Sequence, residues 1–222
     1  MGAISITDAT PAGATGAGAT NEERIRAAAL DCIARHGVSK TTVDDVARQA
    51  GVSRATLYRV FPGGKDTLVD AVLGREVARF FADLAVELRR HDDPEALLVA
   101  GVGRALRFIA DHEALQAVVA TEPGLVLSLV AFHRLGPVLD AATAFAAPFL
   151  RPHVPAGDPD PEGTALDVAE LLVRVVLSHA LRPSPRLDPH DEAAVARLVR
   201  AHLLPALLTE PHPPTKESEV TR

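Results

Sequence analysis

Long stretches of helix-favouring residues, separated by short glycine and proline breaks, constrain what this 222-residue chain can fold into. Leu, Ala and Val dominate these stretches, and the strict alternation of apolar and polar residues that marks strands is scarce. The breaks predict helix ends, so the expected fold class is all-α. Gly136-Pro137 is expected to kink or split one of the helices. The expected helices cover residues 21–36, 43–50, 54–60, 64–90, 94–111, 113–120, 125–149, 164–182 and 191–208.

Composition narrows the setting in which the chain works. Apolar residues make up 47% of it, which is enough for a globular core. The single cysteine, Cys32, excludes an intramolecular disulfide framework, and its apolar helical surroundings predict a buried small hydrophobe. Residues 1–20 lack the basic residues and apolar core of a signal peptide, and no stretch approaches the ~18 apolar residues of a membrane span. We therefore expect a cytoplasmic protein that makes no membrane contact.

Charge is distributed unevenly along the chain, although the net charge of −6 argues against DNA binding at first sight. Residues 21–66 carry eight Lys and Arg against six Asp and Glu, whereas the remainder carries fifteen against twenty-three. Attraction to phosphates is local because salt screens charges beyond about 10 Å. A mildly basic N-terminal segment on an acidic body therefore remains compatible with DNA binding.

The most informative segment is TTVDDVARQAGVSRATLYRVF, at residues 41–61. Thr42 and Asp45 have the spacing of a capping box that opens a short helix. Gly51 can adopt the positive φ that turns the chain sharply after that helix, and Ser53 can cap the next one. Two short helices joined by a glycine turn are the construction of a helix-turn-helix.

The side chains of this segment divide into an inner and an outer set. Ala47 is small where the two helices would cross, while Val43, Val46, Val52 and Leu57 supply apolar contacts. A helical hairpin inside an ordinary core would need these residues but would have no use for polar residues facing outward. Such an outward set fits a helix that places its side chains in the major groove. The outward residues of the second helix are Arg54, Thr56, Tyr58 and Arg59.

The run AGVSRATLYRVF, followed by a lysine and a long helix, resembles the DNA-binding head of the TetR family of one-component repressors. The resemblance covers about residues 22–72. It implies a three-helix head, a fourth helix that joins head to body, a mostly helical ligand-binding body and a homodimer. On this basis we expect a disordered tail at 1–20, the DNA-binding domain at 21–66, the regulatory and dimerisation domain at 67–210 and a second disordered tail at 211–222.

Carried over residue by residue, the resemblance implies a set of DNA contacts. Some of these residues would hold phosphates and fix the position of the head, while others would lie near base edges. Arg54 is the expected guanine contact, because a guanidinium fork matches the O6 and N7 atoms of that base. The expected phosphate contacts are Thr42, Tyr58 and Lys65, and the residues expected near phosphates or bases are Ser53, Arg54, Ala55, Thr56 and Arg59.

Two departures from the family pattern bear on these contacts. Val60 stands where the family commonly has an aromatic residue or His, which would remove one polar contact to the DNA backbone. The link Pro62-Gly63-Gly64 before Lys65 is one residue longer than usual, so the reach of Lys65 to phosphate stays open. Alternatively, the paired glycines could leave N–H groups free at the start of the fourth helix as a phosphate-binding nest.

The 164–182 helix is apolar nearly all round and must be covered on more than one face. We expect a second copy of the chain to cover one face, with the 191–208 helix completing a four-helix interface, as the resemblance also implies. A fully internal core helix is the alternative. Glu170 and Arg174 lie one turn apart on this helix and are expected to form an ion pair. The expected interface residues are Leu171, Val175, His179, Val195, Val199 and Leu203.

Signs of a ligand are weaker. The helices at 94–111 and 125–149 mix aromatic and small residues with occasional polar ones, which is compatible with an apolar pocket and equally with a plain helical core. The alternative function is therefore a DNA-binding regulator that is constitutive or controlled by a protein partner. The expected pocket residues are Gly101, Arg104, Phe108, Leu129, Phe132 and His133.

Motifs for other chemistry do not stand out. The nine histidines form no HExxH or paired i,i+4 arrangement, and Cys32 has no nearby second thiol, so neither a metal site nor a cofactor is expected. The sequence has no nucleophile elbow, phosphate-binding Gly-Lys loop or dinucleotide fingerprint. The function expected from the sequence is thus a ligand-released repressor that binds a near-palindromic operator as a homodimer, and not an enzyme.

Overall fold

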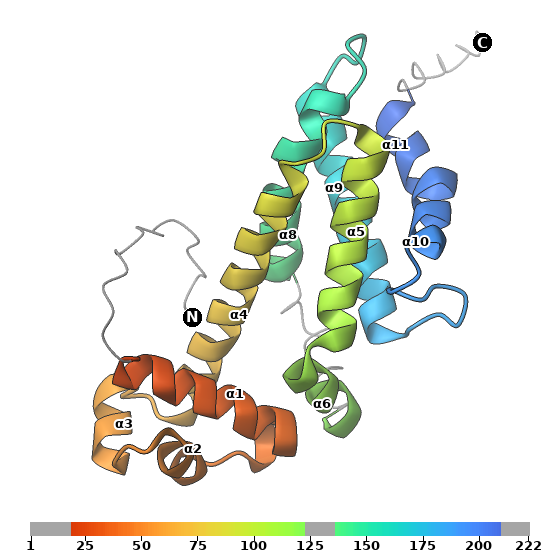
Figure 1. Ribbon diagram of the computed structural model, residues 1–222. Coiled ribbons are helices and arrows are strands. Elements are labelled where there is room, and N and C mark those ends of the chain that lie inside the picture. The colour runs from red at the N-terminus through yellow and green to blue at the C-terminus, as the bar shows by residue number, and fades with distance from the viewer. Residues whose placement is uncertain (1–18, 123–135, 210–222) are drawn as a thin grey trace, which may run out of the picture.

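The computed structural model describes residues 19–122 and 136–209, and within these two ranges every regular element is a helix. The predicted all-α class is confirmed. Three helices gather at one end of the molecule, and a long helix leads away from them (Figure 1). Most of the remaining helices lie beside its far half, whereas α6 lies against α1 (Figure 1). None of the described helices combines the length and the hydropathy that a membrane crossing requires.

The N-terminal helices form a small head. Helix α1 opens with a capping box in which Thr20 and Glu23 exchange hydrogen bonds. The head has its own apolar cluster, centred on the fully buried Ile25 and Leu57, and α4 adds Leu68 and Val72 to it. The expected boundary at residue 66 therefore falls within a helix that the head shares. The elements are α1 (Asn21–Lys40), α2 (Val43–Ala50), α3 (Arg54–Val60) and α4 (Lys65–Leu88).

The body packs along the second half of α4, except for α6, which packs on α1. Its apolar cluster begins at Leu84 on α4 and is distinct from the cluster of the head. Helices α8 and α9 pack against each other, and α5 packs between α4 and α9 (Figure 1). The elements are α5 (Pro94–Asp111), α6 (Glu113–Thr121), α8 (Gly136–Leu150), a 3-10 turn (Arg151–His153), α9 (Pro161–Leu181), α10 (Glu192–Leu198), a π-helical turn (Val199–Leu203) and α11 (Leu204–Leu208).

Several helix ends differ from the expected ones for local reasons. Helix α1 continues past residue 36 to Lys40, because Gly37 alone has non-helical backbone angles and only kinks the helix. Helix α9 starts at Pro161, since Asp160 caps it and proline suits the first helical position. The expected 191–208 helix is interrupted by the π-helical turn. Of the expected 125–149 helix, only the part from Gly136 lies within the described residues.

Candidate nucleic-acid interface

The turn between α2 and α3 is fixed by three hydrogen-bonding caps. Thr42 Oγ1 accepts the N–H of Asp45 at 3.2 Å and donates to its Oδ2 at 2.6 Å, which lowers the pKa of this carboxyl. Gly51 adopts a left-handed conformation with φ 64° and ψ 36°, and Ser53 Oγ accepts the N–H of Thr56 at 3.1 Å. The predicted helix-turn-helix is therefore present.

Helix α3 has a buried and an exposed face. Leu57 is completely buried in the head, and Val46 of α2 lies beside it in the same cluster. The opposite face of α3 has no covering element among the described residues, so it is free to enter a groove (Figure 1). Of the expected DNA contacts on α3 and its cap, Thr56 is half-buried and the others are exposed, namely Ser53, Arg54, Ala55, Tyr58 and Arg59.

The side chain of Arg54 is held by two neighbours. Its Nη1 donates to Asp44 Oδ2 at 2.9 Å, and its guanidinium lies 5.5 Å from the centre of the Tyr58 ring. Tyr58 and, after it, Asp44 raise the pKa of Arg54, so the guanidinium stays charged. Both members of the Arg54–Asp44 pair are more than half exposed, which makes the pair weak. The guanidinium can therefore exchange Asp44 for a DNA partner at small cost.

The link between α3 and α4 is tighter than its two glycines suggest. The N–H of Gly64 donates to the carbonyl of Phe61 at 2.9 Å, so it is not available for a phosphate nest. Gly64 has a φ of 65°, and the Tyr58 ring packs where its side chain would lie, with 3.2 Å between the two. This link positions the Tyr58 ring.

Lys65 does not point freely into solvent. Its Nζ donates to the carbonyl oxygen of Ser39, near the end of α1, at 3.0 Å. The side chain is half-buried, whereas Thr42, the other expected phosphate contact outside α3, is exposed. In this conformation the ammonium group of Lys65 binds the protein itself. The contact of Lys65 with phosphate stays a prediction.

A second contact ties the same end of α1 to the body. Glu122, which directly follows α6, accepts the N–H of Ser39 at 2.9 Å on Oε1 and the hydroxyl of Ser39 on Oε2. Burial alone would raise the pKa of Glu122, but these two hydrogen bonds and the nearby Lys65 hold it below its usual value. Glu122, Ser39 and Lys65 thus form one polar cluster, which we call the head–body contact.

Gly37 is the backbone element that makes the head–body contact fit. It has a φ of 78° and a ψ of 171°, a conformation that side chains disfavour. A Cβ atom there would lie 2.6 Å from Glu122 Oε1 and 2.9 Å from Thr121 Oγ1. The sequence marks Gly37 as a helix break, but no local signal joins it to a residue more than eighty positions away.

The expected ligand-pocket residues are partly visible. Gly101 lies close to Leu88 of α4, where a Cβ would approach the leucine to 3.1 Å. Arg104 lies 3.5 Å from Asp83 of α4, and Phe108 stacks on Phe80 with 4.4 Å between ring centres. These residues therefore face α4 together. The other three, Leu129, Phe132 and His133, lie outside the described residues.

The expected dimer interface needs a correction. Val195, Val199 and Leu203 are at most 1% exposed, because the C-terminal helices pack on α5 and α9 of the same chain. Side chains so deep in one core cannot touch a second copy, so this half of the expected interface is wrong. On α9, Val175 and His179 are half-buried, and Leu171 is 40% exposed.

The expected ion pair on α9 is confirmed. Arg174 Nε donates to Glu170 Oε1 at 2.8 Å, one helical turn away. Both side chains lie on the surface of the described structure and are about half exposed. The pair therefore contributes little to the free energy of unfolding, and its position leaves Arg174 beside the exposed Leu171.

Comparisons with known proteins agree with this geometry. The family model for bacterial regulatory proteins of the TetR family matches residues 25–72, which cover most of α1, all of α2 and α3 and the start of α4. A transcriptional regulator of the HTH type from Mycobacterium bovis is 34% identical over 88 residues, which are 40% of this chain and 44% of the relative. Another from Mycobacterium tuberculosis is 27% identical over 83% of this chain and 86% of its own length.

Solved structures extend the likeness to the body. The crystal structure of the TetR-family repressor AlkX from a Dietzia strain, implicated in biodegradation of n-alkanes, superposes with a TM-score of 0.59. The alignment is 24% identical and covers 82% of this chain and 97% of the other. At this level of identity the likeness concerns the fold, and it includes the helices that follow the head.

Proposed function

We propose that this chain, a TetR-family transcriptional regulator, binds a near-palindromic operator as a homodimer and represses transcription in the cytoplasm. A small, largely apolar ligand releases it from the DNA. The observation that carries the proposal is the exposed face of α3. Leu57 anchors this helix in the head while Arg54, Tyr58 and Arg59 stay accessible. A short helix seated in this way can insert into the major groove and present its N-terminal side chains to base edges.

The proposed contacts divide by role. Arg54 is the base-reading residue, because its guanidinium can bind guanine through two hydrogen bonds once Asp44 releases it. Thr42 and Tyr58 bind phosphates at either end of the recognition unit, and Ser53 and Arg59 add contacts beside them. Lys65 joins them only if DNA draws its ammonium group away from Ser39.

The proposed homodimer rests on an apolar surface of α8 and α9. These two helices pack side by side, and α9 carries Leu166 and Leu171, both 40% exposed. Val138, at the start of α8, is 45% exposed. Large apolar side chains on two adjacent helices are suited to a four-helix interface with the same pair of a second copy. This arrangement replaces the interface with the C-terminal helices, which are already buried within one chain.

Release by a ligand is supported by the way the body meets the head. Helix α4 belongs to both apolar clusters, and the head–body contact joins α6 to the end of α1. A ligand that binds the body better in one arrangement of α4 and α6 would therefore shift the position of the head. The aromatic side chains of Phe80 and Phe108 provide the apolar surface for such a ligand.

The proposal is tested with the full-length chain and DNA. Sites are first selected from a random-sequence library, and binding to the selected site and to a scrambled site is then measured by gel shift from 50 to 200 mM salt. We expect selection of a near-palindrome and a loss of affinity as salt rises, because bound phosphates release counterions. A chain that selects no sequence and shifts no DNA even at low salt would contradict the proposal.

Arg54→Ala separates base reading from phosphate contact in the same assay. Loss of a bidentate base contact costs about 1 to 3 kcal/mol, so binding to the selected site should weaken about five- to 150-fold. Binding to scrambled DNA should change much less. Arg197→Ala is the matched control, because Arg197 is an exposed arginine on α10 of the body. Equal losses on both DNAs would show that Arg54 only contacts phosphate.

A further inference from the structure

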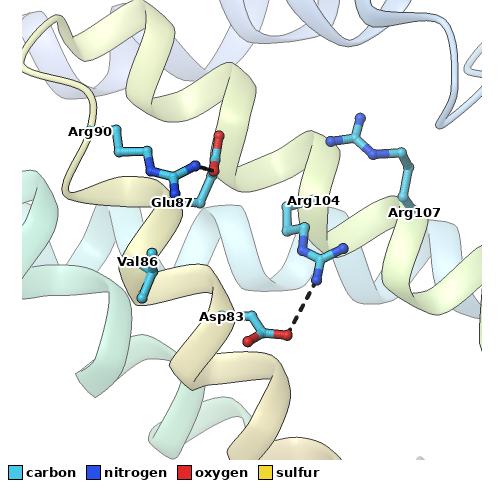
Figure 2. A pocket seen from close by; sticks show the side chains of 6 residues that line it. All are labelled: Asp83, Val86, Glu87, Arg90, Arg104 and Arg107. Atoms are coloured by element: carbon cyan, nitrogen blue, oxygen red, sulfur yellow. Dashed lines mark hydrogen bonds and ion pairs between the residues drawn. The ribbon is translucent and has the colours of Figure 1, made fainter.

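A groove with a volume of about 400 Å³ lies between α4 and α5 of the body (Figure 2). A second hollow of about 180 Å³ shares Asp83 and Arg104 with this groove and adds Glu76, Arg79 and the stacked rings of Phe80 and Phe108. The first hollow is therefore mainly charged, and the second is partly aromatic. The residues that line the first are Asp83, Val86, Glu87, Arg90, Arg104 and Arg107.

Neither of the two arginines that α5 contributes to the groove has a strong counterion. Arg104 reaches from α5 toward Asp83 of α4, and their nearest atoms are 3.5 Å apart, with both side chains about half exposed (Figure 2). Arg107 forms no ion pair within the described residues, and its Nη1 donates only to the carbonyl of Pro189 at 3.4 Å. By contrast, Arg90 donates to Glu87 at 3.0 Å. The guanidinium groups of α5 thus retain most of their capacity to bind an anion.

Both arginines belong to α5 and start three residues apart. Their guanidinium groups point in different directions, since Arg104 extends toward Asp83 of α4 and Arg107 lies back over Gly103 toward the carbonyl of Pro189 (Figure 2). An anion bound at Arg104 would attract the positive charge of Arg107 and draw it from its weak contact with Pro189. Gly103 is shaped to this arrangement, because a Cβ there would lie 3.1 Å from Arg107 Nη1. The missing side chain lets the guanidinium lie close to the helix.

We propose that the α4–α5 groove binds a carboxylate that carries an apolar chain. The carboxylate binds Arg104 in place of Asp83, and Arg107 turns from Pro189 to join it, because planar guanidinium groups match the geometry of a carboxylate. The apolar chain extends toward Phe80 and Phe108, where the second hollow continues the first. Asp83 is the internal carboxylate that the ligand displaces from Arg104. The proposal rests on the proposed function only in making this molecule the ligand that acts on α4. Its binding to the chain can be measured without DNA.

Isothermal titration calorimetry of the full-length protein with octanoate tests this proposal. We expect saturable binding of octanoate. 1-Octanol has the same chain without the charge and should bind at least about tenfold more weakly, because a charge-assisted hydrogen bond contributes more than a neutral one. Arg104→Gln and Arg107→Gln should each weaken octanoate binding at least about tenfold. Arg89→Gln should leave it unchanged, because Arg89 packs over Phe149, away from the groove.

Asp83→Asn is the control that distinguishes the loss of a binding contact from the loss of the fold. It removes the carboxylate that competes for Arg104, so octanoate should bind several-fold more tightly, which a damaged fold cannot produce. Absence of saturable octanoate binding, equal affinity for octanol, or an Arg104→Gln protein that binds like Arg89→Gln would each overturn the proposal. Operator binding by the same preparations without octanoate is measured separately. A chain that binds operator but not octanoate would refute this inference and leave the regulator proposal standing.

Discussion

Gly37→Ala should be one of the most damaging single-methyl changes in the head, although it adds only one carbon atom. The conformation of Gly37, with φ 78° and ψ 171°, is one that non-glycine residues occupy at a cost of about 1 to 3 kcal/mol. The new methyl group would also lie 2.6 Å from Glu122 Oε1, so the carboxylate has to move. Its hydrogen bonds to Ser39 would then weaken, at a cost of about 1.5 to 3 kcal/mol for bonds to a charged group.

Together these costs amount to about 2.5 to 6 kcal/mol, a large part of the 5 to 15 kcal/mol that stabilises a typical domain. Urea unfolding followed by far-UV circular dichroism measures the change in the free energy of unfolding. Gly51→Ala is the matched control, because Gly51 also has a positive φ but a Cβ there would meet nothing within 4 Å. That substitution should cost only about 1 to 2 kcal/mol of backbone strain. A Gly37→Ala protein no less stable than Gly51→Ala would refute the head–body contact.

Three further outcomes follow from the described contacts. Asp44→Asn frees the Arg54 guanidinium and removes a negative charge beside it, so gel shifts should show stronger binding to random DNA, and unchanged binding would mean that the pair already opens freely. Gly74 lies in the interior of α4, and a Cβ there would meet nothing within 4 Å. Because alanine favours the helix more than glycine does, Gly74→Ala should raise the free energy of unfolding in urea by about 0.5 to 1 kcal/mol, unless a second copy covers that position. Folding lowers the pKa of Glu122 from 4.5, so the ionised carboxylate stabilises the wild type relative to Glu122→Gln. This difference in unfolding free energy should be fully present above pH 4.5 and should shrink as the pH falls through the pKa of the folded state. A difference in unfolding free energy that does not change between pH 6 and pH 3 would contradict this assignment.

The sequence predicts the head well because the determinants there are local. Thr42, Gly51 and Ser53 each act on residues within a few positions, and the structure has all three at the expected helix ends. The separation of Leu57 from Arg54 and Tyr58 likewise follows from the helical period alone. Local hydrogen bonds and periodicity leave little choice in such a segment.

The body is predicted less well because its contacts are long-range. Periodicity shows that Val199 and Leu203 need covering, but it cannot say whether their own chain or a second copy covers them. The contact between Glu122 and Ser39 spans 83 positions and leaves no pattern in the sequence. Arg104 was expected in an apolar pocket, whereas the structure also places Arg107 and Asp83 around it. Charges on different helices become a site only through tertiary packing.

A hydroxyl-radical footprint of the full-length protein on its selected DNA site, combined with native mass spectrometry of the complex, tests the central claim most directly. If the exposed face of α3 is duplicated by a twofold partner, two protected segments should appear with centres about 34 to 36 Å apart along the duplex, with two chains bound. A single protected segment with one chain per duplex would contradict the account.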